Sequence, residues 1–189
     1  MARYAVLGED LSDGETLRVL IRRLARNERL TVKVKGYDGC GQLLRKGARD
    51  LDEFVNQGYD RFVVAYDADR DDPAARLARA RAQVVDPSRA PSSACCIVVP
   101  VEELEAWLLA DVSAVSKRWP GWRPEPIANP ERVRDPKEHL EKLSRDSQRR
   151  PRYSHAVDNP MLAGLIDLEI VEKKCPSFRV LAEFVRANP

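Results

Sequence analysis

The sequence contains few cysteines and histidines, and none has the spacing of a zinc site. His139 and His155 are the only histidines, and each is interpreted as an ordinary polar residue. The four cysteines are Cys40, Cys95, Cys96 and Cys175. No cysteine pair has the two-residue spacing that zinc sites use, so we expect reduced, mostly packed thiols in a cytoplasmic protein.

Several motifs that define common protein classes are also missing. No apolar run approaches the roughly 18 residues that a membrane span needs, and no N-terminal segment is apolar enough for a signal peptide. The glycines between Gly36 and Gly41 are not followed by Lys-Ser or Lys-Thr, which excludes a P-loop. No Gly-x-Ser-x-Gly elbow is present for a nucleophilic triad. With a net charge of only +2, any basic footprint for nucleic acid has to be local.

The most informative stretch is an apolar run, 62–66, that ends in a group of aspartates. A short run rich in β-branched and aromatic residues is typical of a central strand in a parallel sheet. Asp67, Asp69, Asp71 and Asp72 follow it directly. Asp67 and Asp69 are two residues apart, so in extended chain they point the same way, and two like charges there favour a bound cation. Carboxylate oxygens suit Mg²⁺ or Mn²⁺, whereas the alternative is a solvated acidic turn that caps the next helix.

The order of elements predicts an α/β fold. Strands are expected at 4–7, 30–34, 62–66 and 94–99, separated by helices at 12–27, 44–55 and 73–85, with Ser12 and Glu15 as a capping box. This alternation indicates a parallel four-stranded sheet flanked by helices. A helix over 102–111 and a proline-rich connection over 119–136 follow, and then helices at 136–143, 160–172 and 176–187. We therefore predict an α/β core over 1–111 and a helical C-terminal cover over 112–189.

Three sources of carboxylates are expected to meet at one edge of this sheet. Glu9 follows the first strand, Asp67 and Asp69 follow the third, and the glutamates of 102–105 follow the fourth. The carboxyl ends of parallel strands share an edge, where ligands of open α/β sheets bind. Among the glutamates we favour Glu105 over Glu102, because Ala106 and Trp107 beside it suggest close packing over the site.

The pattern of strand-Glu-helix followed by strand-Asp-x-Asp resembles the Toprim domain of topoisomerases, primases and overcoming-lysogenization-defect (OLD) nucleases. The chain as a whole, from residue 3 to about residue 185, resembles the small Toprim-like proteins of domain-of-unknown-function family 4276. The matching stretches are Gly8-Glu9-Asp10 with Asp13, Asp67-Ala-Asp69, Val101-Glu-Glu-Leu-Glu-Ala-Trp107, Asp135-Pro-Lys137 and Lys173-Lys-Cys-Pro-Ser-Phe178. One departure is Asp10, because a glycine usually follows the Toprim glutamate.

This resemblance implies a Toprim-like, Rossmann-like fold and phosphoryl transfer on nucleic acid, either DNA or RNA. Glu9, Asp67 and Asp69 would be the metal carboxylates for Mg²⁺ or Mn²⁺, and Glu105 a further catalytic acid. Candidates for phosphate contact in the helical cover are Lys137, Lys173 and Lys174, with ordinary surface lysines as the alternative. The expected function is a metal-dependent nuclease, with an ATPase partner suggested by the family's place in phage defence.

Two other functions stay open at this point. The same acidic edge would serve a non-catalytic protein that binds a metal or nucleotide as the partner or sensor subunit of an ATPase. Alternatively, Asp67 would be the covalent nucleophile of a phosphatase-like hydrolase with Asp69 as its acid partner. Against that reading, such Asp-x-Asp motifs usually follow the first strand, whereas Asp67 follows the third.

Overall fold

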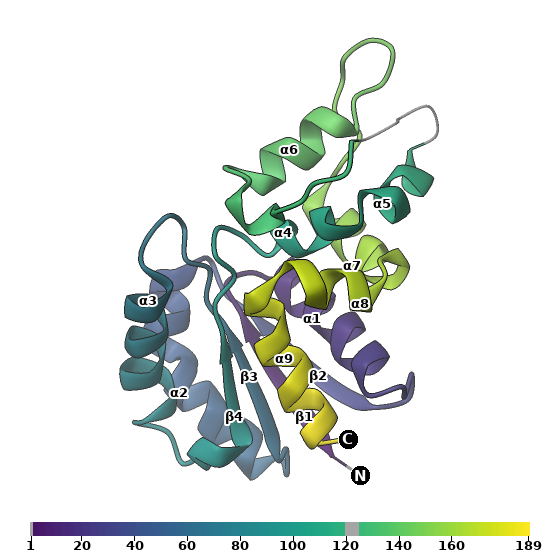
Figure 1. Ribbon diagram of the computed structural model, residues 1–189. Helices are drawn as coiled ribbons and strands as arrows, with labels where there is room; N and C mark the ends of the chain where they lie inside the picture. The colour runs from purple at the N-terminus through teal and green to yellow at the C-terminus, as the bar shows by residue number, and fades with distance from the viewer. Residues whose placement is uncertain (1, 120–124) are drawn as a thin grey trace.

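The chain forms a parallel β-sheet with helices on both faces. The computed structural model describes residues 2–119 and 125–189 (Figure 1). Its strands are β1 (Arg3–Gly8), β2 (Thr31–Gly36), β3 (Arg61–Ala65) and β4 (Cys95–Val98). Its α-helices are α1 (Leu11–Leu24), α2 (Cys40–Asn56), α3 (Pro73–Ala80), α4 (Glu105–Leu108), α5 (Val112–Arg118), α6 (Pro136–Leu143), α7 (His155–Leu165), α8 (Leu168–Lys174) and α9 (Pro176–Ala187). A π-helical turn, Arg81–Val85, extends α3, and 3-10 turns occupy Ser92–Ala94, Leu109–Asp111 and Pro130–Arg132.

The strand order is β2-β1-β3-β4, and every neighbouring pair is parallel. Val6 in β1 lies opposite Val34 on one side and Val63 on the other. The chain therefore winds outward from β1 to β2 and then returns to β3 and β4 on the other side of β1. The winding reverses between β1 and β3, and crevices at such a switch point are where open α/β sheets bind ligands. The predicted α/β class with a four-stranded parallel sheet is confirmed.

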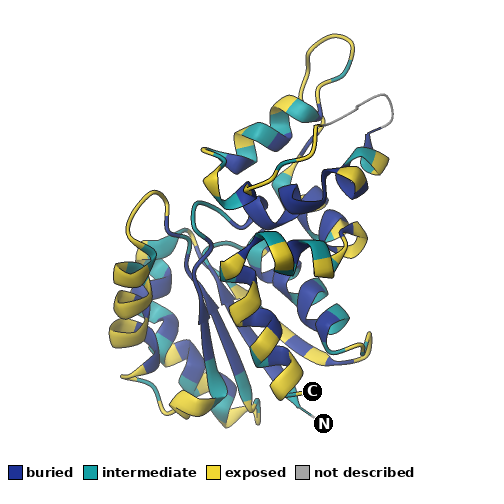
Figure 2. Cartoon of the chain, viewed as in Figure 1, coloured by how far each residue is buried: buried dark blue, intermediate teal, exposed yellow. Residues whose placement is uncertain are grey.

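The two faces of the sheet hold separate apolar clusters, because side chains alternate along each strand. The face covered by α2 and α3 buries Ala5, Leu7, Phe62 and Val64. The opposite face, covered by α1, α9 and the helices between α4 and α9, buries Tyr4, Val6, Val63 and Ala65. Figure 2 shows β1, β3 and β4 as mostly buried, whereas β2 at the edge of the sheet has exposed positions.

The helices after the sheet pack on the second of these clusters. The indole of Trp107 in α4 and the ring of Phe178 in α9 meet edge to face, with centroids 5.2 Å apart. Trp107 Nε1 also donates a hydrogen bond to Ser177 Oγ (2.7 Å), so the buried indole N–H is satisfied. These contacts hold α4, which follows β4, against α9 at the end of the chain.

The predicted capping box at Ser12 and Glu15 is wrong. Asp10 is the N-cap of α1, and its side chain accepts from the Asp13 amide while Asp13 reaches back to the Asp10 amide. An Asp-x-x-Asp pair performs the same reciprocal capping two residues earlier. Ser12 instead donates its hydroxyl to the His155 carbonyl (2.8 Å), and Glu15 pairs with Arg18.

Several predicted helices have different bounds, and two of these differences change how the C-terminal half is described. The predicted 160–172 helix is two helices, because α7 contains Pro160 internally and ends at Leu165, and Asp167 then caps α8 through the Glu169 amide (2.9 Å). The predicted 102–111 helix begins only at Glu105, since 101–104 form a turn. The proline-rich connection falls partly on residues 120–124, which lie outside the described residues.

No helix in residues 2–119 or 125–189 combines the length and apolar character needed to cross a membrane. The cytoplasmic location stays a prediction.

Candidate functional site

Two glycines allow the first turn of α1 to cross the end of the sheet. Gly8 and Gly36 lie opposite each other at the carboxyl ends of β1 and β2. A Cβ on Gly36 would lie 2.4 Å from the Leu11 backbone nitrogen, and one on Gly8 would lie 2.9 Å from the Gly14 nitrogen. Only glycine permits this close approach. As a result the acidic start of α1 lies directly beside Glu9.

The loop after β3 is tied to the ends of both neighbouring strands. The Asp67 amide donates to Glu9 Oε1 (2.9 Å), which joins the end of β3 to the end of β1. The Ala68 and Asp69 amides donate to the carbonyls of Pro100 and Glu102, at 2.9 and 3.1 Å, beyond β4. Asp69 has a φ of 48°, in the left-handed region that costs a non-glycine residue energy. The loop is thus held in a strained shape at the point where the acids meet.

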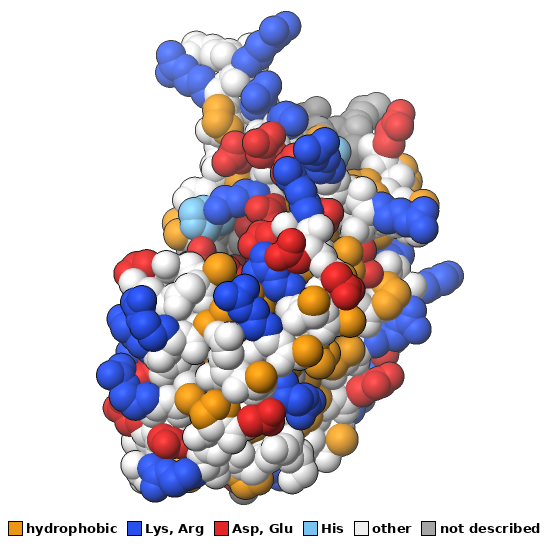
Figure 3. Space-filling view, turned by 90° about the vertical axis from the view of Figure 1, so that its left-hand side faces the viewer, with side chains coloured by type: hydrophobic (Ala, Val, Ile, Leu, Met, Phe, Trp, Pro, Cys, Tyr) orange, Lys and Arg blue, Asp and Glu red, His pale blue; other side chains and the backbone are white. Residues whose placement is uncertain are grey.

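These segments enclose an acidic cleft of about 240 Å³ at the switch point of the sheet. It is lined by Glu9, Asp10, Asp13, Gly39, Asp67, Asp69, Glu103, Glu105 and Lys137. The structure therefore brings together Glu9, Asp67, Asp69 and Glu105, which the sequence pattern selected. Glu102 is not part of this lining, and its carboxylate instead lies 3.9 Å from Arg70 Nε. On the face drawn in Figure 3, basic side chains are scattered among acidic ones rather than gathered in one stripe.

The crowding of carboxylates raises their pKa values. Burial, followed by the charge of Asp69, raises the pKa of Glu9 from 4.5 to about 7. Burial, followed by Asp10 and Glu105, raises the pKa of Asp13 from 3.8 to about 8. Burial first, and then Asp13 and Glu9, raise the pKa of Asp67 well above its ordinary value. Each shift means that the cleft disfavours the charged form and lacks a sufficient counter-ion.

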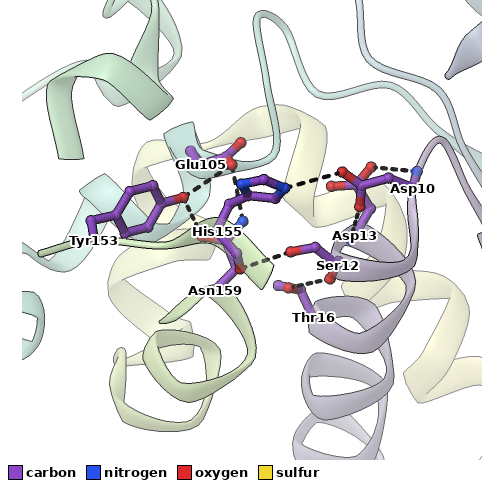
Figure 4. A network of polar contacts seen from close by, with 8 residues as sticks. All are labelled: Asp10, Ser12, Asp13, Thr16, Glu105, Tyr153, His155 and Asn159. Carbon is purple, nitrogen blue, oxygen red and sulfur yellow. Dashed lines mark hydrogen bonds and ion pairs between the residues drawn. The ribbon is translucent and has the colours of Figure 1, made fainter. Parts of the chain in front are cut away.

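Glu105 is held in the cleft by residues from the end of the chain. Its residue exposure is 5%, and its Oε1 accepts hydrogen bonds from the Tyr153 hydroxyl (3.1 Å) and from Asn159 Nδ2 (2.9 Å). Figure 4 shows these side chains turned toward one another, with His155 reaching from the start of α7 toward Asp10. His155 Nε2 lies 3.7 Å from Asp10 Oδ2.

One arginine lies at the edge of the cleft. The Arg76 guanidinium stacks 4.7 Å above the Tyr66 ring and lies 2.9 Å from Asp71 and 3.8 Å from Asp69. Its side chain is only 11% exposed. The positive charge lowers the pKa of Glu9, which partly opposes the effects of burial and of Asp69.

The three predicted phosphate-contact lysines lie in different places. Lys137 lines the acidic cleft, and its amide donates to Glu103 Oε2 (2.9 Å). Lys173 and Lys174 line a separate cavity of about 660 Å³ that also contains Arg132. Lys174 Nζ donates to the Ala110 carbonyl (2.8 Å). The structure therefore places only Lys137 among the acids.

Sequence reasoning missed several residues of the cleft. Glu103 has no role of its own in the predicted site, because a helix is expected over 102–111, whereas 101–104 form a turn. Asp10 and Asp13 were noted in the family motif without a place in the site, and their Asp-x-x-Asp spacing was the available signal. Tyr153 and Asn159 had no local signal, because their contact with Glu105 depends on how α7 packs.

The donor set suits a hard divalent cation, although the side chains have to move to surround one. In the part of the chain that the structure describes, no three His, Cys, Asp or Glu side chains are already arranged as ligands of one metal ion. Carboxylate oxygens are nevertheless the ligands that Mg²⁺ and Mn²⁺ prefer. The raised pKa of Asp67 also favours a cation at this site, because a nearby positive charge would reduce the repulsion of Asp67 by Glu9 and Asp13.

The fold and the cleft define an α/β protein with a carboxylate site at the switch point of a parallel sheet. The chain belongs to the family described as Domain of unknown function (DUF4276), whose model matches residues 8–186. No curated protein and no solved structure matches the chain. The relationship to Toprim domains and OLD nucleases stays a prediction.

Proposed function

We propose that this protein is a divalent-metal-dependent nuclease, or a related phosphotransfer enzyme, that acts on DNA or RNA. The observation that carries the proposal is the acidic cleft, in which seven carboxylates are accompanied by a single lysine. Such an excess of like charge in a partly buried space is costly unless protons or cations offset it. Of these two, a divalent cation both balances the negative charge and can activate a phosphate group for reaction.

Asp67, Asp69 and Glu9 are the residues that would hold Mg²⁺ or Mn²⁺. When bound, the ion would polarise a phosphoryl oxygen and neutralise developing charge. Glu9 would serve either as a ligand of the ion or as the general base, but not as both at once. Lys137 is the cleft residue suited to contact a phosphate oxygen.

The strand-Glu and strand-Asp-x-Asp pattern supports the same class of chemistry, because it resembles the Toprim pattern of nucleases and primases. Glu9 follows β1 and Asp67 follows β3, the two strands that meet at the switch point. A place in a bacterial defence module beside an ATPase is part of this proposal and rests on the resemblance alone.

The proposal is tested by nicking of plasmid DNA and cleavage of RNA with Mg²⁺ or Mn²⁺. We expect the Asp67→Asn plus Asp69→Asn double variant to lose at least about 100-fold in rate, the usual cost of removing a dominant electrostatic group. Asp86→Asn, an exposed aspartate that does not line the cleft, is the matched control and keeps its rate. Equal rates in the double variant and the wild type would remove these aspartates from the mechanism.

A second candidate is a non-catalytic subunit that binds a metal or nucleotide and partners an ATPase. The observation in its favour is Asp10, which lines the cleft where the Toprim pattern has glycine. Its charge would repel a substrate phosphate. Isothermal titration separates the two, since Mn²⁺ binding without turnover on any DNA or RNA substrate supports the non-catalytic function.

A further inference from the structure

The two carboxylate oxygens of Glu105 have different surroundings. Oε1 accepts from both Tyr153 and Asn159. Oε2 has no hydrogen-bond partner within residues 2–119 and 125–189, although the residue as a whole is 5% exposed. The buried unpaired atoms in these ranges are Arg61 Nε and Tyr66 OH, so Oε2 is not sealed from solvent. Since Glu105 lines the cleft, its free oxygen is open to the space among the acids.

The two donors are themselves held rigidly. The single hydroxyl proton of Tyr153 is shared between Glu105 Oε1 (3.1 Å) and Asn159 Oδ1 (2.5 Å), and the Tyr153 amide donates to Ser144 Oγ (2.8 Å). The Tyr153 ring packs edge to face on Trp119 with centroids 6.1 Å apart, and Asn159 is completely buried. A carboxylate supported in this way is fixed in orientation before any ligand arrives.

A second buried carboxylate shows what a purely structural pairing looks like. Asp50 in α2 is 3% exposed and accepts from the Tyr37 hydroxyl at Oδ2 (2.8 Å). Its other oxygen lies 3.3 Å from an Arg49 nitrogen. Both oxygens of Asp50 are thus engaged, whereas Glu105 keeps one oxygen for the cleft.

We infer that Tyr153 and Asn159 are positioning residues that hold Oε1 of Glu105 so that Oε2 is presented to a divalent cation in the acidic cleft. This inference rests on the proposed function. It assigns part of the site to α7 and the segment before it, which lie far from the strand-end acids in the sequence.

The test is the affinity for Mn²⁺, measured by electron paramagnetic resonance and by isothermal titration at one pH. Tyr153→Phe keeps the ring but removes the hydroxyl, and we expect about tenfold weaker binding, as for other residues that orient a metal ligand. Tyr37→Phe is the matched control, because it removes the equivalent hydroxyl from Asp50, and it changes the affinity less than about twofold. Asn159→Ala provides a second variant if Tyr153→Phe fails to fold.

A double-mutant cycle with Glu105→Gln separates positioning from general stability. If Tyr153 acts through Glu105, the Tyr153→Phe change has no further effect on Mn²⁺ affinity in the Glu105→Gln background. A loss of the same size in both backgrounds would overturn the inference, and so would wild-type affinity in both Tyr153→Phe and Asn159→Ala. In those outcomes the proposed function survives. A wild-type protein that binds no Mn²⁺ would overturn both.

Discussion

The two faces of the sheet differ in how much polar material they bury. The face under α2 and α3 is covered by helices from the first half of the chain and buries one charged residue, Asp50. The face under α1 and α9 is covered by helices from both ends of the chain. The other buried polar residues in the described ranges all lie on or beyond this second face: Ser12, Thr16, Glu105, Asp111, Ser144, Asp158 and Asn159.

These polar groups join helices rather than fill space. Asp111 caps α5 through the Ala114 amide (3.2 Å) and accepts from the Asp167 amide before α8 (2.9 Å). Asp158 in α7 accepts from Arg118 Nε (3.0 Å), at the end of α5. Buried polar groups are costly unless paired, so each bond selects one arrangement of the helices. One face therefore supplies mainly packing, whereas the other also determines where Glu105 lies.

The largest effect is expected from removing an aromatic side chain on either face. Phe178→Ala and Phe54→Ala each delete a buried ring, and both are expected to lower the free energy of unfolding by about 3–5 kcal/mol. Only Phe178→Ala is expected to weaken Mn²⁺ binding as well, because Phe178 supports Trp107 in the helix that carries Glu105. Urea unfolding and titration calorimetry measure the two effects. Equal loss of Mn²⁺ affinity in both variants would remove the contrast between the faces.

A smaller effect is expected from pH on the metal-free protein. The folded-state pKa values of Glu9 and Asp13, about 7 and about 8, lie above their ordinary values of 4.5 and 3.8. Their stabilising contribution is therefore fully present below about pH 4 and is lost as the pH rises through 7 to 8. Taken at full size, the two shifts correspond to about 6 kcal/mol between pH 5 and pH 8. Because solvent in the open cleft screens the charges, we expect the free energy of unfolding to fall by about 2 kcal/mol.

Asp13→Asn should reduce this pH dependence and make the metal-free protein more stable at pH 8, whereas the exposed Asp86→Asn should leave it unchanged. Added Mn²⁺ should raise the free energy of unfolding of the wild-type protein at pH 8, because a bound cation reduces the same repulsion between carboxylates. Denaturant melts at a series of pH values provide the measurement. If the free energy of unfolding instead rose with pH, repulsion between the carboxylates of the acidic cleft would not be the cause of the pH dependence.

The smallest effect concerns the lysines. Lys137→Gln removes the positive charge of a cleft-lining residue that partly opposes the rise in the pKa of Glu103 caused by burial, whereas Lys173→Gln removes one from the separate cavity beside α9. For binding of a short DNA duplex with Ca²⁺, we expect the salt dependence to fall by about one unit of slope in Lys137→Gln and to stay unchanged in Lys173→Gln. Fluorescence anisotropy of labelled DNA over a range of salt concentrations measures this slope for each variant. The opposite pattern would move the nucleic-acid contact to the cavity beside α9.

Much of the acid cluster could be predicted because its signals are local. An apolar run that stops at Asp67 marks a buried strand end, and Glu9 stands in the same position after the first strand. Parallel strands share their carboxyl edge, so these two residues had to lie on one side of the sheet. The sequence did not reveal that β1 and β3 are neighbours at the switch point, because strand order depends on how the helices cross over.

The pattern of apolar and polar residues was sufficient to determine the α/β class, the strand ends and the acids attached to them, since backbone period and strand direction are short-range properties. Only tertiary packing decided that Glu103 rather than Glu102 enters the cleft and that Lys137 lies apart from Lys173 and Lys174. It also decided that Tyr153 and Asn159 hold Glu105. Those outcomes depend on contacts between residues far apart in the chain. The arrangement of helices that makes these contacts is stabilised by the whole core rather than by any one segment.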